Sequence, residues 1–137
     1  MARLLGSGHG SDTDDIVAIQ QLLARYNTAA DLGDGEGFAA TFTEDGVSAA
    51  GDTVTTGRVA LAERGGGVPQ RTPGIRHWVN NHVINVDGDN ATATVYVMVV
   101  VTGAGGPKIV ASGRYSDQMR RTSEGWRFSR REFVVDA

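Results

Sequence analysis

Cysteine is absent from the 137-residue sequence, which excludes disulfide bonds, thiolate metal ligands and a cysteine nucleophile. Long apolar runs are absent too, because none approaches the ~20 residues that a membrane-spanning helix needs. The N-terminal stretch carries only a Leu pair, which is too short for the apolar core of a signal peptide. We therefore expect a cytoplasmic protein that does not associate with membranes.

Basic charge is also scarce. Thirteen Lys and Arg residues against 16 Asp and Glu residues give a net charge of -3, which argues against a nucleic-acid partner. Hydrophobic residues make up 40% of the chain and charged residues 21%, as in folded globular proteins. The length predicts one domain, which we place at residues 12–137, after a flexible tail over residues 1–11.

The strongest pattern in the chain begins at Ile16, where apolar residues recur with helical spacing at positions 16, 19, 22, 23, 26, 29 and 30. Ser11 followed by Asp14 is typical of a helix start. Tyr26 lies on the apolar face of this predicted helix. Asp31 falls at its exit, where a negative charge opposes the helix dipole, so it is either a functional carboxylate or a solvated exit residue.

The rest of the chain reads as short elements followed by long strands. We predict a second helix over Gly35–Thr43, a turn at residues 44–46, two short strands up to Thr56 and a helix over Gly57–Arg64. Residues 65–74, with four glycines and two prolines, are predicted to form a loop at a pocket mouth. Turn signals then separate four long strands: Ile75–Val86, Ala91–Thr102, Lys108–Arg121 and Trp126–Val135. The order predicts an α+β fold, with a bent antiparallel sheet around the first helix.

Several short motifs follow one another in a characteristic order: Arg25-Tyr26, Asp31-Leu32-Gly33-Asp34, Phe42-Thr43-Glu44-Asp45-Gly46, Arg76-His77 with Asn81, Gly113-Arg114-Tyr115, and Gly125-Trp126-Arg127-Phe128. In this order they resemble the SnoaL-like branch of the nuclear transport factor 2-like superfamily, over roughly residues 12–136. The resemblance implies a cone-shaped α+β barrel, in which a curved mixed sheet wraps around the long helix and encloses an apolar cavity. Members include polyketide cyclases, dehydratases, ketosteroid isomerases, epoxide hydrolases and non-catalytic subunits, so the fold leaves the function open.

The first long strand carries two histidines. If its side chains alternate regularly, Val79 and Asn81 share a face with His77, whereas His82 lies on the opposite face. The resemblance favours His77 as the residue inside the cavity. Two histidines on opposite faces also argue against a metal site.

Tyr26, Asp31 and His77 look like the catalytic set of bile-acid-type dehydratases. An imidazole can exchange a proton near neutral pH, a carboxylate can fix its tautomer, and a tyrosine hydroxyl can polarise a carbonyl. Purely structural roles remain open: Tyr26 could be a core residue, and the Asp31–His77 pair could simply link the helix to the sheet. Tyr26 and Asp31 lie roughly 140° apart around an ideal helix, so a direct meeting requires the helix to loosen at its exit.

We therefore expect a cofactor-independent dehydratase- or cyclase-like lyase that acts on a hydrophobic small molecule. Five further residues are expected to contact this substrate: Phe42, Val79, Asn81, Tyr96 and Tyr115. One alternative is a non-catalytic binding protein or partner subunit. The other is a ketosteroid isomerase-like enzyme, although the position of its carboxylate base matches about Ala50.

An epoxide hydrolase is disfavoured because Arg114 and Asp117 lie three residues apart and should face opposite ways on a strand. The valine-rich segment Val95–Val101 offers apolar residues on both faces of its strand. Such a segment favours pairing with a second copy, so we expect a homodimer.

Overall fold

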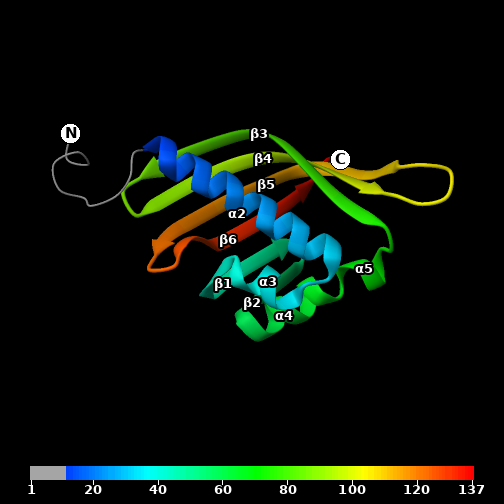
Figure 1. Ribbon diagram of the computed structural model, residues 1–137, viewed down its shortest axis with the longest axis horizontal. Helices are drawn as coiled ribbons and strands as arrows, with labels where there is room; N and C mark the ends of the chain where they lie inside the picture. Colours follow the sequence, from blue (N-terminus) through cyan, green and yellow to red (C-terminus); the bar gives the residue numbers. More distant parts are fainter. Residues whose placement is uncertain (1–11) are drawn as a thin grey trace.

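The computed structural model describes residues 12–137, so the predicted tail and the helix-start residue Ser11 lie outside the described part. A long helix, α2, is followed by short helices and a six-stranded sheet (Figure 1). The helices are α2 (Asp12–Leu32), α3 (Gly35–Ala40), α4 (Arg58–Gly66) and α5 (Val68–Arg71). The strands are β1 (Phe42–Ala50), β2 (Thr53–Thr56), β3 (Ile75–Asp87), β4 (Asn90–Val101), β5 (Lys108–Thr122) and β6 (Gly125–Val135).

The sheet has the strand order β2-β1-β6-β5-β4-β3, and α2 lies across one of its faces (Figure 1). Every strand pair is antiparallel except β1 with β6, which is parallel, so the sheet is mixed. The predicted α+β class and the curved sheet around the first helix are confirmed, and the sheet is mixed, as the resemblance implies, rather than antiparallel throughout. No helix among residues 12–137 has the length and apolar character to cross a membrane.

The core lies between α2 and the sheet. Ile19, Leu22 and Leu23 of α2 are fully buried, as their helical spacing predicts, and they pack with Trp126 and Phe128 of β6. At the start of α2, the buried Asp15 accepts hydrogen bonds from two guanidinium nitrogens of Arg121, at 2.7 and 3.0 Å. It also accepts one from Nε1 of Trp126 at 3.2 Å. These bonds fix the first turn of the helix to the far end of the sheet.

Two local predictions are wrong. The second helix ends at Ala40 rather than Thr43, and β1 already begins at Phe42, in place of the predicted turn at residues 44–46. A shift in the β1–β6 register between Phe42 and Val47 explains the turn-like sequence, because the strand carries its irregularity within a pairing that continues.

The glycine-rich segment is helical rather than a loop. Helix α4 extends through Gly66, and α5 follows with a proline in its first turn. A Cβ added at Gly65 would lie 2.4 Å from Cγ of Phe38, so the missing side chain lets α4 pack directly against α3. This close approach outweighs the low helix propensity of glycine. It also places α5 beside the end of α2.

Candidate active site

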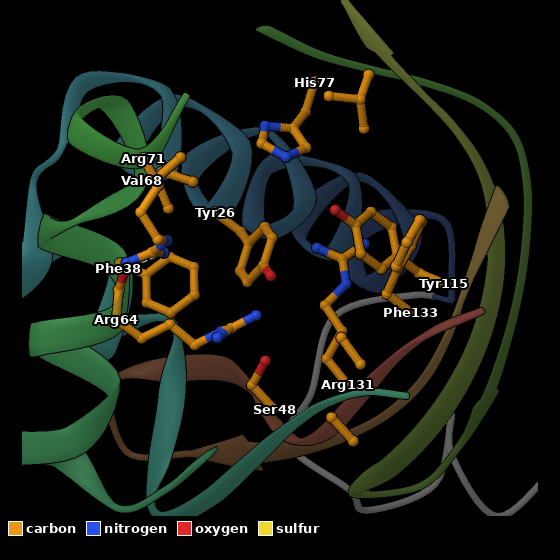
Figure 2. A pocket seen from close by; sticks show the side chains of 14 residues that line it. Tyr26, Phe38, Ser48, Arg64, Val68, Arg71, His77, Tyr115, Arg131 and Phe133 are labelled. Atoms are coloured by element: carbon orange, nitrogen blue, oxygen red, sulfur yellow. Dashed lines mark hydrogen bonds between the residues drawn. The ribbon is translucent and has the colours of Figure 1, made fainter. Parts of the chain in front are cut away.

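A cavity of about 130 Å³ lies between the C-terminal half of α2, the α4–α5 segment and the sheet (Figure 2). The residues around it combine aromatic and aliphatic side chains with a few polar groups. They are Tyr26, Ala30, Phe38, Ser48, Ala49, Ala50, Arg64, Val68, Arg71, His77, Val99, Tyr115, Arg131 and Phe133. This mixture is typical of a small-molecule site, in which apolar walls hold the ligand and few polar groups orient it.

His77 projects its ring into this cavity from β3 (Figure 2). Its Nδ1 lies 2.6 Å from Oδ1 of Asp31, and its backbone N–H donates to Oδ2 of the same carboxylate at 3.3 Å. Both side chains are largely buried, with 14% and 11% of their surfaces exposed. Because a carboxylate accepts, Nδ1 carries the hydrogen, and in the neutral imidazole Nε2 keeps its lone pair. Asp31 thus fixes both the position and the tautomer of His77.

Asp31 and Tyr26 do not meet directly, and α2 does not loosen at its exit. The helix runs unbroken to Leu32. The two side chains point in different directions from α2: Tyr26 points into the cavity, whereas Asp31 faces β3. Asp31 therefore acts on the cavity only through its hydrogen bond to His77 of that strand.

Tyr26 lies within an aromatic cluster. Its ring centroid is 4.7 Å from that of Phe38 and 5.8 Å from that of Tyr115. Burial raises the pKa of Tyr26, although the charge of Arg131 opposes the shift. Burial likewise raises the pKa of Tyr115 far above its ordinary value. Both hydroxyls therefore stay protonated at neutral pH, and Tyr26 is suited to donate a hydrogen bond rather than to act as a base.

A buried ion pair lies next to these tyrosines. Nε of Arg131 is 3.0 Å from Oδ1 of Asp117, and the two side chains are 1% and 0% exposed. The N–H does not point at the oxygen as a hydrogen bond requires. Burial raises the pKa of Asp117 to about 6, against the lowering effect of the Arg131 charge. The guanidinium stacks on the Tyr115 ring, with Cζ 3.4 Å from the ring centroid.

Of the five expected substrate contacts, only Tyr115 lines the cavity. Phe42 is almost fully buried, with its ring 5.5 Å from that of Phe128, so it belongs to the core. Val79 packs against the edge of the core from β3. Tyr96 is 57% exposed and lies over a separate groove formed by β3, β4 and β5.

The predicted position of Asn81, on the same face as His77, is wrong because β3 is not a regular strand. The register with β4 shifts by one residue between Asn80 and Val83, and Asn81 has a positive φ of 54°. This β-bulge interrupts the alternation, so Asn81 is exposed, while Ile84 and Val86 pack against the core. His82 is exposed, as predicted.

Four polar cavity residues were not predicted: Ser48, Arg64, Arg71 and Arg131. Asp117 had a visible signal, since it alternates with Tyr115 and Met119 along the buried face of β5. No such signal marked Arg131, because a bulge falls in β6. Phe128 pairs with Met119 but Arg130 pairs with Gln118, which leaves Ser129 as the extra residue. The bulge brings Arg131 to the inner face in place of Arg130.

Comparison with known proteins identifies the family of the chain. A profile of the SnoaL-like domain matches residues 11–132. The chain belongs to the SnoaL-like domain family. No curated protein matches the sequence.

Several solved structures resemble the chain over most of its length. Rv3472 from Mycobacterium tuberculosis, a protein of unknown function, is 36% identical, with a TM-score of 0.85 over 91% of this chain and 73% of that one. A nuclear transport factor 2-like protein with a cystatin-like fold, from Novosphingobium aromaticivorans, is 32% identical, with a TM-score of 0.82 over 90% and 82% of the two chains. A candidate scytalone dehydratase from the same bacterium is 25% identical, with a TM-score of 0.79 over 92% and 87% of the two chains.

Proposed function

We propose that this SnoaL-like protein is a cofactor-independent lyase, of the dehydratase or cyclase type, that acts on a small cyclic ketone in its cavity. The observation that carries the proposal is the 2.6 Å contact between Nδ1 of His77 and Oδ1 of Asp31, which leaves Nε2 of His77 facing the cavity. Membership of the family and the likeness to a candidate scytalone dehydratase support it.

In a dehydration, Nε2 of His77 takes a proton from the carbon next to the substrate carbonyl. The electron pair moves into an enolate, whose oxygen accepts a hydrogen bond from the Tyr26 hydroxyl. The imidazolium, stabilised by Asp31, then returns the proton to the departing hydroxyl on the next carbon. The C–O bond breaks, a carbon–carbon double bond forms and one water molecule leaves, so the protein ends in its starting protonation state.

The enzyme proposal can be tested with 3-hydroxycyclohexanone, whose dehydration to cyclohexenone is followed by ultraviolet absorbance. We expect turnover in the wild type and its loss in His77→Ala. Asp31→Asn should lower kcat by a factor of about 10²–10⁴, because the tautomer of the imidazole is no longer fixed. Tyr26→Phe should lower it by about 10²–10³, as for the loss of one oxyanion donor.

His82→Ala is the matched control, because it removes a histidine from the exposed side of the same strand. It should leave turnover unchanged. Full activity in a folded His77→Ala protein would disprove the role of the dyad.

Two other functions compete with this proposal. A binding protein or partner subunit would bind the ketone without converting it, in every variant. An isomerase of the ketosteroid type would need a carboxylate base on β1, where Ser48, Ala49 and Ala50 line the cavity instead. The hydrogen-bonded dyad favours the lyase over both.

A further inference from the structure

The charged side chains around the cavity are all of one sign. Arg64, Arg71 and Arg131 line it, and none of the lining residues is Asp or Glu. This contrasts with the whole chain, whose net charge is -3. The two nearby carboxylates, Asp31 and Asp117, stand behind His77 and Arg131 and are not part of the lining.

Arg131 has hydrogen-bonding capacity that the protein leaves unused. Its Nε, Nη1 and Nη2 atoms are buried and have no hydrogen-bond partner within residues 12–137. Its position is nevertheless fixed, since the guanidinium lies 3.4 Å from the Tyr115 ring centroid, 4.3 Å from that of Tyr26 and 4.7 Å from that of Phe128. A buried donor left without an acceptor destabilises the protein, and a charged donor does so more than a neutral one. A ligand oxygen in the cavity would remove this destabilisation.

Arg64 approaches the cavity from the side opposite Arg131, and the Tyr26 hydroxyl lies between the two guanidinium groups in this view (Figure 2). No carboxylate within residues 12–137 forms an ion pair with it. Arg71 is more exposed, and its Nη2 donates to the backbone carbonyl of Arg64 at 3.0 Å, which caps the end of α4. Within the described residues, Arg64 is therefore free of an ion pair at the cavity, and Arg131, although it is ion-paired with Asp117 through Nε, keeps two Nη groups without a hydrogen-bond partner.

The volume of the cavity sets the size of that ligand. A protein cavity of about 150 Å³ holds one benzene molecule. The cavity here, at about 130 Å³, is close to that size, so it accommodates about one six-membered ring. A polycyclic substrate would have to extend beyond it.

We propose that the substrate is a carboxylate of single-ring size, whose anionic group lies between Arg131 and Arg64 while its ring faces His77. That the bound carboxylate is converted rests on the proposed function, whereas its binding is argued from the arginines alone. Charge-assisted hydrogen bonds to a carboxylate are roughly twice as strong as neutral ones. Tyr26 then donates to the ring carbonyl, and the carboxylate determines which ring carbon meets Nε2 of His77.

Binding of benzoate and of its neutral analogue benzamide, measured by isothermal titration calorimetry in chloride-free buffer, tests this inference. We expect benzoate to bind the wild type at least ten-fold more tightly than benzamide. Arg64→Met should weaken benzoate about ten-fold and leave benzamide unchanged. Arg131→Gln should abolish the preference. Arg114→Met, on the exposed side of β5, is the control and should change neither affinity.

Equal affinities for benzoate and benzamide, or no binding of either, would overturn the inference. The wild-type comparison and Arg64→Met keep it testable even if Arg131→Gln does not fold. Because neither ligand reacts, the test is independent of turnover. If the protein prefers benzoate but dehydrates no ketone, the lyase is disproved and the anion site is supported. If it dehydrates 3-hydroxycyclohexanone but does not prefer benzoate, the anion site is disproved and the lyase is supported.

Discussion

The buried carboxylate of Asp117 should make folding stability fall as the pH rises through the mildly acidic range. Burial raises its pKa from the ordinary value of 3.8 to about 6 in the folded protein. The folded state therefore holds this proton more tightly than the unfolded state does. Stability is greatest below about pH 4 with respect to this group, and it is lost progressively between about pH 4 and pH 6.

The size of the effect follows from the shift. Each pKa unit corresponds to about 1.4 kcal/mol, so the change from 3.8 to about 6 is a loss of about 3 kcal/mol across the window. Asp117→Asn removes the titration while it keeps the shape of the side chain. The free energy of unfolding of the wild type, minus that of Asp117→Asn, should fall by about this amount between pH 4 and pH 7.

Urea denaturation followed by tryptophan fluorescence at several pH values measures this difference, because Trp126 is buried. Asp45→Asn is the matched control. A hydrogen bond from Thr43 lowers the pKa of Asp45 below its ordinary 3.8, so the stability that this group contributes is lost only as the pH falls below about 4, and its difference curve should stay nearly flat between pH 4 and pH 7. A wild-type and an Asp117→Asn protein with parallel stability profiles would show that burial of the carboxylate does not shift its titration.

Three further outcomes follow from the packing. Gly65→Ala should lower the free energy of unfolding by about 1–3 kcal/mol, because the added Cβ would lie 2.4 Å from Phe38. Gly103→Ala is the control and should be neutral, since its Cβ would meet no neighbour; equal melting temperatures for the two variants would contradict this. Asp15→Ala should cost about 1–3 kcal/mol in urea denaturation, since the Trp126 indole N–H loses its carboxylate acceptor and Arg121 loses two of its hydrogen bonds, although Arg121 keeps those to Asp89 and Gly88; a cost under ~0.5 kcal/mol would refute it. The exposed side chains of Trp78 and Tyr96 should pair two copies of the chain, so we expect a dimer in gel filtration at micromolar concentration and a monomer for Trp78→Glu; a monomeric wild type would refute this.

Most of the fold was predictable because its signals are local. The spacing of apolar residues locates α2, and turn residues between long β-rich runs locate β3 to β6. The candidate dyad was identified from motif order, and the structure brings Asp31 and His77 into contact. The glycine-rich segment was predicted wrongly because its helical state depends on contact between Gly65 and Phe38, which are distant in sequence.

The polar lining of the cavity escaped prediction for a different reason. Alternation along a strand predicts its faces only while the strand is regular, and one extra residue reverses every position that follows. Asn81 in β3 occupies a left-handed conformation that asparagine tolerates better than most residues, but asparagine has many other uses in a sequence. Ser129 in β6 has no sequence feature that predicts a bulge. Its hydroxyl donates to the carbonyl of Gln118 at 3.1 Å, a contact that only the structure reveals.

The β6 bulge has a chemical consequence for the cavity. Regular alternation from Trp126 and Phe128 would turn Arg130 inward and leave Arg131 in solvent, where a basic residue is normally found. The extra residue instead places Arg131 beside Asp117, a carboxylate 14 positions earlier in the chain, and over the Tyr115 ring. The dyad side of the cavity could therefore be inferred from motif order, whereas its anion-binding side required the three-dimensional register of two strands.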